Sequence, residues 1–160
     1  MLPYWMKKKK KKATEDSLFP TEKKKRKPDL VKKLDKVFAL YIRLRDVMPN
    51  GYGKCISCGR IKSFKELDCG HFHGRTHMAT RFEEDNAHAE CIACNRMSSD
   101  HLIKYRENLI DKIGIGRYDR LNLLRHSVKH WLDCELQEKI DYYTNEVKRL
   151  SAEKGIKVNL

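Results

Sequence analysis

The sequence contains no long apolar segment. Its longest uninterrupted apolar run covers residues 37–42 of 160, far short of the roughly 20 residues that a membrane-spanning helix needs. Residues 2–6 are too few for the apolar core of a signal peptide, and six lysines follow them directly. There is also no internal repeat. These absences predict an intracellular protein without a membrane segment.

Acidic residues are few relative to basic ones. The chain has 22 Asp and Glu against 35 Lys and Arg, which gives a formal net charge of +13. Residues 1–27 hold eleven of the basic residues and only three of the acidic ones, so most of the excess lies in this segment. Such a chain attracts polyanions, and nucleic acid is the commonest of them. The charge by itself does not distinguish DNA from RNA or from a membrane surface.

The basic segment at the N-terminus also has little apolar content. Lys7–Lys12 and Lys23–Lys27 are blocks of like charge, which repel themselves and bury too little surface to fold. We therefore predict a disordered arm over residues 1–28 and a single folded domain over residues 29–160.

Apolar spacing predicts an α+β fold with long helices. Residues 29–48 form the first helix, with Asp29 as its N-cap and Pro49-Asn50-Gly51 ending it. Further helices are predicted over residues 101–114, which Gly114 and Gly116 end, and over residues 117–152, with a break at His126-Ser127. Residues 61–68 favour a strand, an irregular loop follows, and residues 95–100 form a polar turn. The apolar faces of the first and last helices either pack together within one chain or form a dimer interface.

Four of the six cysteines occur as two Cys-x-x-Cys pairs: Cys55, Cys58, Cys91 and Cys94. Four thiolates in this arrangement complete a tetrahedral zinc shell, and a pair of disulfides is the alternative for the same residues. An intracellular chain favours zinc. We therefore predict a structural Zn²⁺ that anchors a core over residues 53–100. Cys69 and Cys134 lie outside the pattern and are predicted to be buried free thiols.

A carboxylate, an imidazole and an amide lie between these pairs or directly after them: Asp68, His71 and Asn95. Singly, they are most simply a surface carboxylate, a packed or solvated histidine and a polar turn residue. Together, the carboxylate and the amide offer the hard oxygen ligands that Mg²⁺ accepts, with water and phosphate oxygens completing the shell. A neutral histidine nearby can deprotonate the attacking water. The arrangement predicts a small metal-dependent nuclease site.

These residues resemble the HNH, or ββα-metal, nucleases, in particular the zinc-containing, endonuclease VII-like type. The likeness lies in the order of Asp68-x-x-His71, Asn86 and Cys91-Ile92-Ala93-Cys94-Asn95. The resemblance implies a small zinc-anchored ββα-metal core flanked by long helices. It further implies Mg²⁺ or Mn²⁺ bound by Asp68 and Asn95, with His71 as the general base. Asn86 is then expected to tie the loop to the strand.

Similarity to the lambdoid phage NinG, or Rap, recombination endonucleases covers about residues 30–150. It rests on Cys55-Ile56-Ser57-Cys58-Gly59, Asp68-Cys69-Gly70-His71, Arg81-Phe82, Asn86-Ala87-His88, Cys91 to Asn95, and Tyr105-Arg106 with Leu109-Ile110. The resemblance implies cutting of branched DNA, such as Holliday junctions and displacement loops, in the cytoplasm of a bacterial host. His88 is expected to support the zinc knuckle. Cutting two strands of one junction favours a homodimer. The Lys-rich arm departs from the family pattern, and we interpret it as a source of non-specific DNA attraction.

Several basic residues near the site are candidates for gripping the phosphates on either side of the cut: Arg75, Arg81, Arg96, Lys104 and Arg106. His73 and His77 either contact a phosphate or a metal ion, or are solvated loop histidines. Two other functions are compatible with the sequence. One is an HNH nuclease that cuts linear duplex DNA, of the homing or packaging type. The other is a non-catalytic zinc module that binds DNA.

Overall fold

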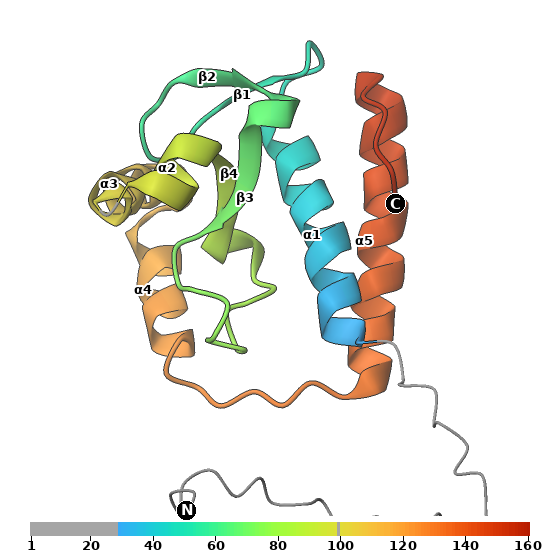
Figure 1. The fold of residues 1–160 in the computed structure, drawn as a ribbon. Coiled ribbons are helices and arrows are strands. Elements are labelled where there is room, and N and C mark those ends of the chain that lie inside the picture. Colours follow the sequence, from blue (N-terminus) through green and yellow to red (C-terminus); the bar gives the residue numbers. More distant parts are fainter. Residues whose placement is uncertain (1–28, 99) are drawn as a thin grey trace, which may run out of the picture.

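The computed structural model describes residues 29–98 and 100–160, and the predicted disordered arm over residues 1–28 lies outside this range. Within it, the chain forms helices and two small two-stranded sheets (Figure 1), which confirms the predicted α+β class. None of the helices in the described segments is long and apolar enough to cross a bilayer.

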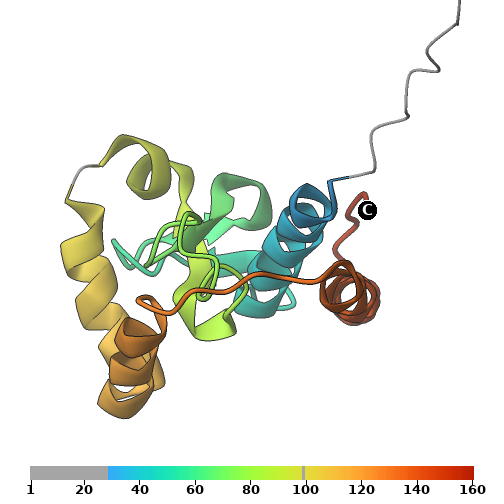
Figure 2. The ribbon, with the colours of Figure 1, turned by 90° about the horizontal axis from the view of Figure 1, so that it is seen from below.

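The helices α1 (Leu30–Asp46) and α5 (Asp133–Lys154) lie side by side and run in the same direction (Figures 1 and 2). Asp29 caps α1, because its Oδ1 accepts a hydrogen bond from the backbone N of Lys32 at 3.2 Å. The apolar faces of the two helices pack on each other and bury Leu34, Val37, Phe38, Tyr41, Ile42, Leu44, Leu136, Ile140, Tyr143, Val147 and Leu150. Of the two predicted uses of these faces, the structure shows packing within one chain.

Lys154 joins the C-terminal ends of α1 and α5. Its Nζ donates hydrogen bonds to the carbonyl oxygens of Leu44, at 2.7 Å, and Val47, at 2.6 Å. The last carbonyls of a helix have no partner within it, and a cation placed there also interacts favourably with the helix dipole. The end of α1 that leads into the first hairpin is therefore held by a residue far along the chain.

Two antiparallel hairpins occupy the centre of the fold. β1 (Tyr52–Lys54) pairs with β2 (Ile61–Ser63), and β3 (Leu67–His71) pairs with β4 (Ala87–Cys91). The single strand predicted over residues 61–68 is wrong, because one turn of 3-10 helix, η2 (Phe64–Glu66), separates β2 from β3. Glu66 Oε2 accepts hydrogen bonds from the backbone N of Ser63 at 3.1 Å and from its Oγ at 2.7 Å. This capping box ends β2 and starts the turn.

Three short helices follow β4. α2 (Ile92–Met97) occupies the first half of the segment predicted to be a polar turn, and its helical spacing brings Cys94 to the same side as Cys91. α3 (His101–Ile113) and α4 (Ile115–Leu124) meet at Gly114, whose φ of 80° is one that a residue with a Cβ rarely adopts. Gly116, which was expected to end a helix, lies within α4. Residues 125–132 then cross irregularly to α5 (Figure 1).

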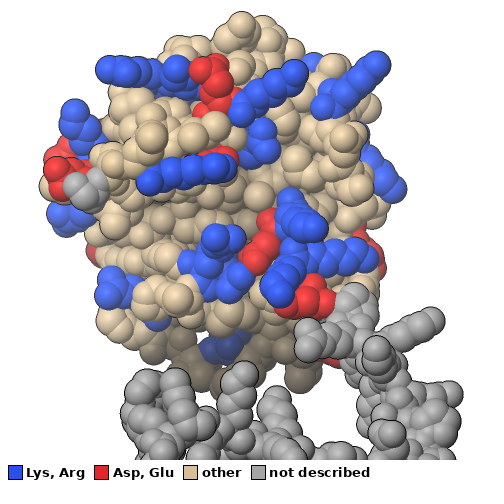
Figure 3. All heavy atoms as spheres, viewed as in Figure 1, with Lys and Arg blue, Asp and Glu red and all other residues tan. Residues whose placement is uncertain are grey.

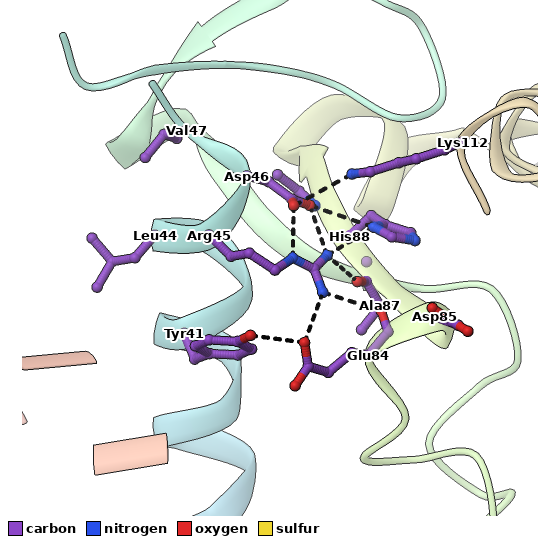
Figure 4. A network of polar contacts seen from close by, with 12 residues as sticks. Tyr41, Leu44, Arg45, Asp46, Val47, Glu84, Asp85, Ala87, His88 and Lys112 are labelled. Carbon is purple, nitrogen blue, oxygen red and sulfur yellow. Dashed lines mark hydrogen bonds and ion pairs between the residues drawn. The ribbon is translucent and has the colours of Figure 1, made fainter. Parts of the chain in front are cut away.

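A buried polar network joins α1 to β4 and α3 (Figure 4). Arg45 donates to both carboxylate oxygens of Asp46, at 2.8 and 3.1 Å, and to the carbonyl of Ala87 at 2.9 Å. Asp46 also accepts from the backbone N of Ala89 at 2.8 Å and lies 3.3 Å from Lys112 Nζ. Burial would raise the pKa of Asp46, but the hydrogen bonds and positive charges of Arg45 and Lys112 lower it well below its ordinary value. The ionised carboxylate thus holds three elements together.

We expect Asp46→Ala to lower the free energy of unfolding by about 3–5 kcal/mol. The change removes the carboxylate that accepts hydrogen bonds from the largely buried guanidinium of Arg45 and from the backbone N–H of Ala89. Urea denaturation measures this loss. Asp111→Ala is the matched control, since Asp111 is exposed on α3 and forms no ion pair with any described residue. Equal stability of the two variants would contradict the role assigned to the network.

Candidate active site

The four paired cysteines come together at one point of the fold. Their sulfur atoms all lie within 4.8 Å of one another, and Cys58 Sγ is 3.8 Å from Cys91 Sγ. A tetrahedral zinc ion with Zn–S bonds of about 2.3 Å separates its sulfurs by about 3.8 Å, so the cluster fits such an ion. All four are free thiols, and their spacing is far above the roughly 2.05 Å of a disulfide. The cluster can therefore bind a metal such as zinc, and it connects the first hairpin to β4 and α2.

A cleft of about 680 Å³ opens between α1, β3, α2 and the start of α3. Asp68 and His71 reach it from β3, and Asn95 reaches it from α2. The three residues singled out in the sequence therefore share one cavity, although they belong to two separate elements. Figure 3 shows Lys and Arg side chains spread over this side of the molecule, with acidic side chains between some of them.

Asp68 is held by two adjacent residues in the second half of α2. Arg96 donates to it through Nε at 2.7 Å and through Nη2 at 3.0 Å, and Asn95 Nδ2 donates at 3.2 Å. Partial burial would raise the pKa of Asp68, but these hydrogen bonds lower it below its ordinary value. The side chain is therefore a carboxylate near neutral pH. Because Asn95 uses its amide nitrogen here, its amide oxygen is left as an acceptor or a ligand.

His71 is fixed by a backbone carbonyl. Its Nε2 lies 3.0 Å from the carbonyl oxygen of Arg81, and since a carbonyl only accepts, Nε2 carries the hydrogen. Burial lowers the pKa of His71 below its ordinary value, so the ring is neutral near pH 7 and the lone pair is on Nδ1. Arg81 is itself anchored, because its Nε donates to Asp35 Oδ1 on α1 at 2.9 Å. The histidine is thus presented as a base whose ring is held in place.

The predicted phosphate-binding residues fall into three groups. Arg75 and Arg96 line the cleft, and Arg96 pairs with Asp68. Lys104 and Arg106 are exposed on α3. The guanidinium of Arg81 is engaged inside the protein, where it also donates through Nη1 to the carbonyl of Arg75 at 2.8 Å.

Asn86, in the short 3-10 helix η3 (Glu84–Asn86), is fully buried. Its Oδ1 accepts from the backbone N of His73 at 2.7 Å, and its Nδ2 donates to the carbonyls of His73 and Thr80, each at 2.9 Å. These hydrogen bonds tie the loop after β3 to the start of β4. His73 is not a solvated loop histidine, because it is only 6% exposed and its Nε2 donates to Asn122 on α4 at 3.0 Å. His77 is half-buried beside it.

His88 is buried on β4 and faces the polar network, away from the zinc knuckle that it was expected to support. Its Nδ1 lies 2.8 Å from Arg45 Nη2, and since a guanidinium only donates, this nitrogen accepts. Burial lowers the pKa of His88, which agrees with a neutral ring. His88 therefore helps to attach β4 to α1.

Two residues beside the cleft had no recognisable signal in the sequence. His101 lines the cleft at the start of α3, and Glu90 is fully buried behind it on β4. Glu90 Oε1 accepts from Ser57 Oγ and lies 2.7 Å from His101 Nδ1, whereas Oε2 has no partner among the described residues. A Cβ on Gly70 would collide with this carboxylate. The glycine that precedes His71 is therefore required for β3 to pass over Glu90.

The remaining cysteines differ from each other. Cys69 is partly buried at the cleft, and burial raises the pKa of its thiol to about 12. It is therefore a protonated thiol and a poor metal ligand. Cys134 was predicted to be buried but is exposed in the first turn of α5, because the buried face of that helix begins at Leu136.

Sequence comparison finds relatives among bacteriophage proteins. The model of a family described as "Bacteriophage Lambda NinG protein" matches residues 5–153. Protein ninG of Salmonella phage P22 is 36% identical over 99 residues, which cover 60% of this chain and 47% of that protein. Protein ninG of Escherichia phage lambda is 35% identical over 96 residues, which cover 54% of this chain and 45% of that protein. The chain thus spans about half the length of the curated relatives it matches, and no solved structure matches it.

Proposed function

For this chain, which belongs to the NinG family of bacteriophage proteins, we propose a metal-dependent endonuclease activity that hydrolyses phosphodiester bonds of branched DNA during phage recombination. One observation carries the proposal. Asp68, His71 and Asn95 line a single cleft, as an ionised carboxylate, a neutral imidazole and an amide. A DNA-binding module without catalytic activity has no use for these three groups in one cavity.

The local topology supports an HNH-type core. β3 and β4 are antiparallel neighbours, and α2 follows β4 without a break, so the segment has the ββα order. The first strand bears Asp68 and His71, and the helix bears Asn95. Cys91 and Cys94 lie at the junction of β4 and α2. A zinc ion in the cysteine cluster would therefore fix the helix relative to the strands.

His71 is the general base in this proposal. Its Nδ1 lone pair takes a proton from the water that attacks phosphorus, while the carbonyl of Arg81 keeps the ring oriented through Nε2–H. As the imidazole becomes positively charged, the Arg81 carbonyl stabilises it, because the Nε2–H···O hydrogen bond becomes stronger. The bond from phosphorus to the 3′-oxygen breaks as the new P–O bond forms.

Asp68 and Asn95 are the residues that would hold a catalytic cation. One carboxylate and one amide oxygen, facing a cleft with room for water and phosphate, fit the oxygen-rich shell of Mg²⁺ or Mn²⁺. When bound there, the ion would supply Lewis-acid stabilisation of the charge on the phosphate and the leaving oxygen. Arg96 must release at least one oxygen of Asp68 for this carboxylate to serve as a ligand.

DNA would be held by the basic residues around the cleft. Arg75 and Arg96, which line the cleft, would contact the phosphate to be cut, and Lys104 and Arg106, which are exposed on α3, would contact its neighbours. The formal charge of +13 predicts affinity that falls steeply with salt. Two copies acting together would place one site at each of the two strands of a junction.

The proposal is tested by incubating the full chain with labelled four-way, three-way, looped and linear DNAs in Mg²⁺, in Mn²⁺ and in excess EDTA, and then mapping the nicks. We expect metal-dependent cuts close to the branch point. Cleavage of linear duplex at the same rate would instead favour the homing or packaging type of HNH nuclease. Tight DNA binding without any cleavage would favour the non-catalytic module.

Removing the side chain of Arg96 should raise the affinity of the site for Mg²⁺ and lower its affinity for DNA. We expect Arg96→Ala to lower the Mg²⁺ concentration for half-maximal cleavage by about two- to five-fold, because an exposed ion pair that competes for Asp68 is removed. DNA affinity should decrease in the same variant, since one phosphate contact is lost. Titrations of cleavage and of DNA binding measure the two effects. Arg120→Ala, exposed on α4 and outside the cleft, should change neither.

A further inference from the structure

A second cavity, of about 380 Å³, adjoins the candidate active site. It lies between the residues that follow β3 and the helices α3 and α4. Phe72 and Leu102 line both cavities, so the two are contiguous. Phe72 is the residue directly after His71, which ends β3. A group bound in the second cavity is therefore next to the proposed reaction centre.

One side of this cavity is aromatic. The rings of Phe72 and Tyr118 have their centroids 5.7 Å apart and are tilted by 52°. Arg106 Nε donates to the hydroxyl of Tyr118 at 2.9 Å, and its guanidinium carbon lies 5.6 Å from the centroid of the same ring. Aromatic rings and guanidinium planes are the surfaces on which unpaired bases stack.

The other side has hydrogen-bonding groups, and one of them, the amide of Asn122, is oriented before any ligand arrives. His73 is buried in the wall, and its Nε2 donates to Asn122 Oδ1 at 3.0 Å. This hydrogen bond orients the amide of Asn122 and leaves its Nδ2 as a donor with no partner among the described residues. Glu107 adds a carboxylate acceptor to the same cavity. Donors and acceptors of this kind match the edge of a nucleobase.

Positive charge is placed at the rim. Arg125 lines the cavity, is exposed, and forms no ion pair within the described part of the chain. With Arg106 it gives the cavity two guanidinium groups against the single carboxylate of Glu107. This charge suits the phosphate that accompanies a base.

We propose that this second cavity is a nucleotide subsite that takes one unpaired base of branched DNA, beside the phosphate to be cut. The inference rests on the proposed function. A base within a continuous duplex must be unstacked and unpaired before it can enter a lateral cavity, and this penalty is smallest for a base that is already single-stranded. Branch points, flaps and displacement loops offer such bases. The subsite therefore selects branched DNA over continuous duplex.

The test deletes the base and the side chain separately. A three-way DNA is prepared with each unpaired nucleotide next to the mapped nick replaced in turn by an abasic site. Cleavage is then compared for the wild type, Asn122→Ala, Arg125→Ala and Arg120→Ala. We expect removal of one particular base to slow the wild type about 10-fold or more, as loss of a stacked base does elsewhere. Asn122→Ala and Arg125→Ala should be slow on the intact DNA and insensitive to removal of that base. Arg120→Ala, on the same helix as Asn122 but outside the cavity, should behave as the wild type.

A binding measurement separates this inference from the proposed function. The same DNA, carrying 2-aminopurine in turn at each unpaired position of the branch and mixed with protein in Ca²⁺, should change its fluorescence at one position with the wild type and much less with Arg125→Ala. An unchanged signal with the wild type, or the same sensitivity to base removal in all four proteins, overturns the subsite. If the wild type cuts no DNA in Mg²⁺ or Mn²⁺ yet shows the Arg125-dependent signal, the nuclease proposal fails and the subsite is supported as a site for DNA binding.

Discussion

Replacing His71 by alanine is expected to lower the rate of junction cleavage by about 10²–10⁴-fold, the usual effect of losing a general base. Zinc content and junction binding should stay the same, because the imidazole is not part of the cysteine cluster and is not one of the basic groups proposed to contact phosphates. Single-turnover cleavage in Mg²⁺ measures the change. His77→Ala is the matched control, since His77 is half-buried on the loop that follows β3 but lies outside the cleft. Equal activity of the two variants would reject His71 as the base.

The pH dependence provides an independent check on the same residue. Only neutral His71 can accept a proton, and burial lowers its pKa below the ordinary value of about 6.5. Cleavage should therefore fall as the pH drops through this lowered pKa, so the midpoint of the acid limb should lie below pH 6.5. The residual activity of His71→Ala should lack this limb. A midpoint above pH 7 in the wild type would indicate that a different group controls the rate.

Removing one ligand of the cysteine cluster should have the largest effect on stability. We expect Cys58→Ser to lose most of the bound zinc and to lower the free energy of unfolding by at least about 3 kcal/mol, a fraction of the roughly 10–16 kcal/mol that a structural zinc site contributes. Cys58 is exposed, so the substitution removes little packing and the loss reflects the metal. Metal analysis and thermal unfolding measure the two changes.

Cys134→Ser serves as the control for this prediction, because Cys134 is also exposed but lies outside the cluster. It should keep the zinc content and the stability of the wild type. Added Mg²⁺ should not restore cleavage to Cys58→Ser, since the ions proposed for the two sites have different ligands. Full stability of a zinc-free Cys58→Ser protein would show that the cluster has no structural role.

The long helices and the cysteine cluster could be predicted from local sequence signals. Asp29 supplies an N-cap that is present in the structure, and the apolar positions of residues 29–48 repeat with the helical period. The two Cys-x-x-Cys pairs bring four sulfurs together in the structure. The helix signals lie within the helix itself, and each cysteine pair is a short local motif, although the two pairs are distant in the sequence.

Other features depend on contacts between distant segments. Asp35 and His101 line the cleft from helices that precede and follow the hairpins, and no local pattern indicates that they meet there. Burial of Glu90 depends on the packing of α3 across β4 and on the absence of a side chain at Gly70. The split between β2 and β3 is an exception, because its signal is local: Ser63 and Glu66, which form the capping box, both lie within the segment predicted to be one strand.

The parallel pairing of α1 with α5 determines how far the domain can be shortened. The core of these helices also contains Phe82 and Ala87, and Cys69 packs against it, so α1 covers one face of the β3–β4 sheet and α5 covers α1 from the other side. A fragment reduced to residues 50–113 would keep every proposed catalytic group and all four clustered thiols, but this face would be open to water. The shortest fragment that contains all the proposed catalytic residues is therefore shorter than the shortest fragment that can fold.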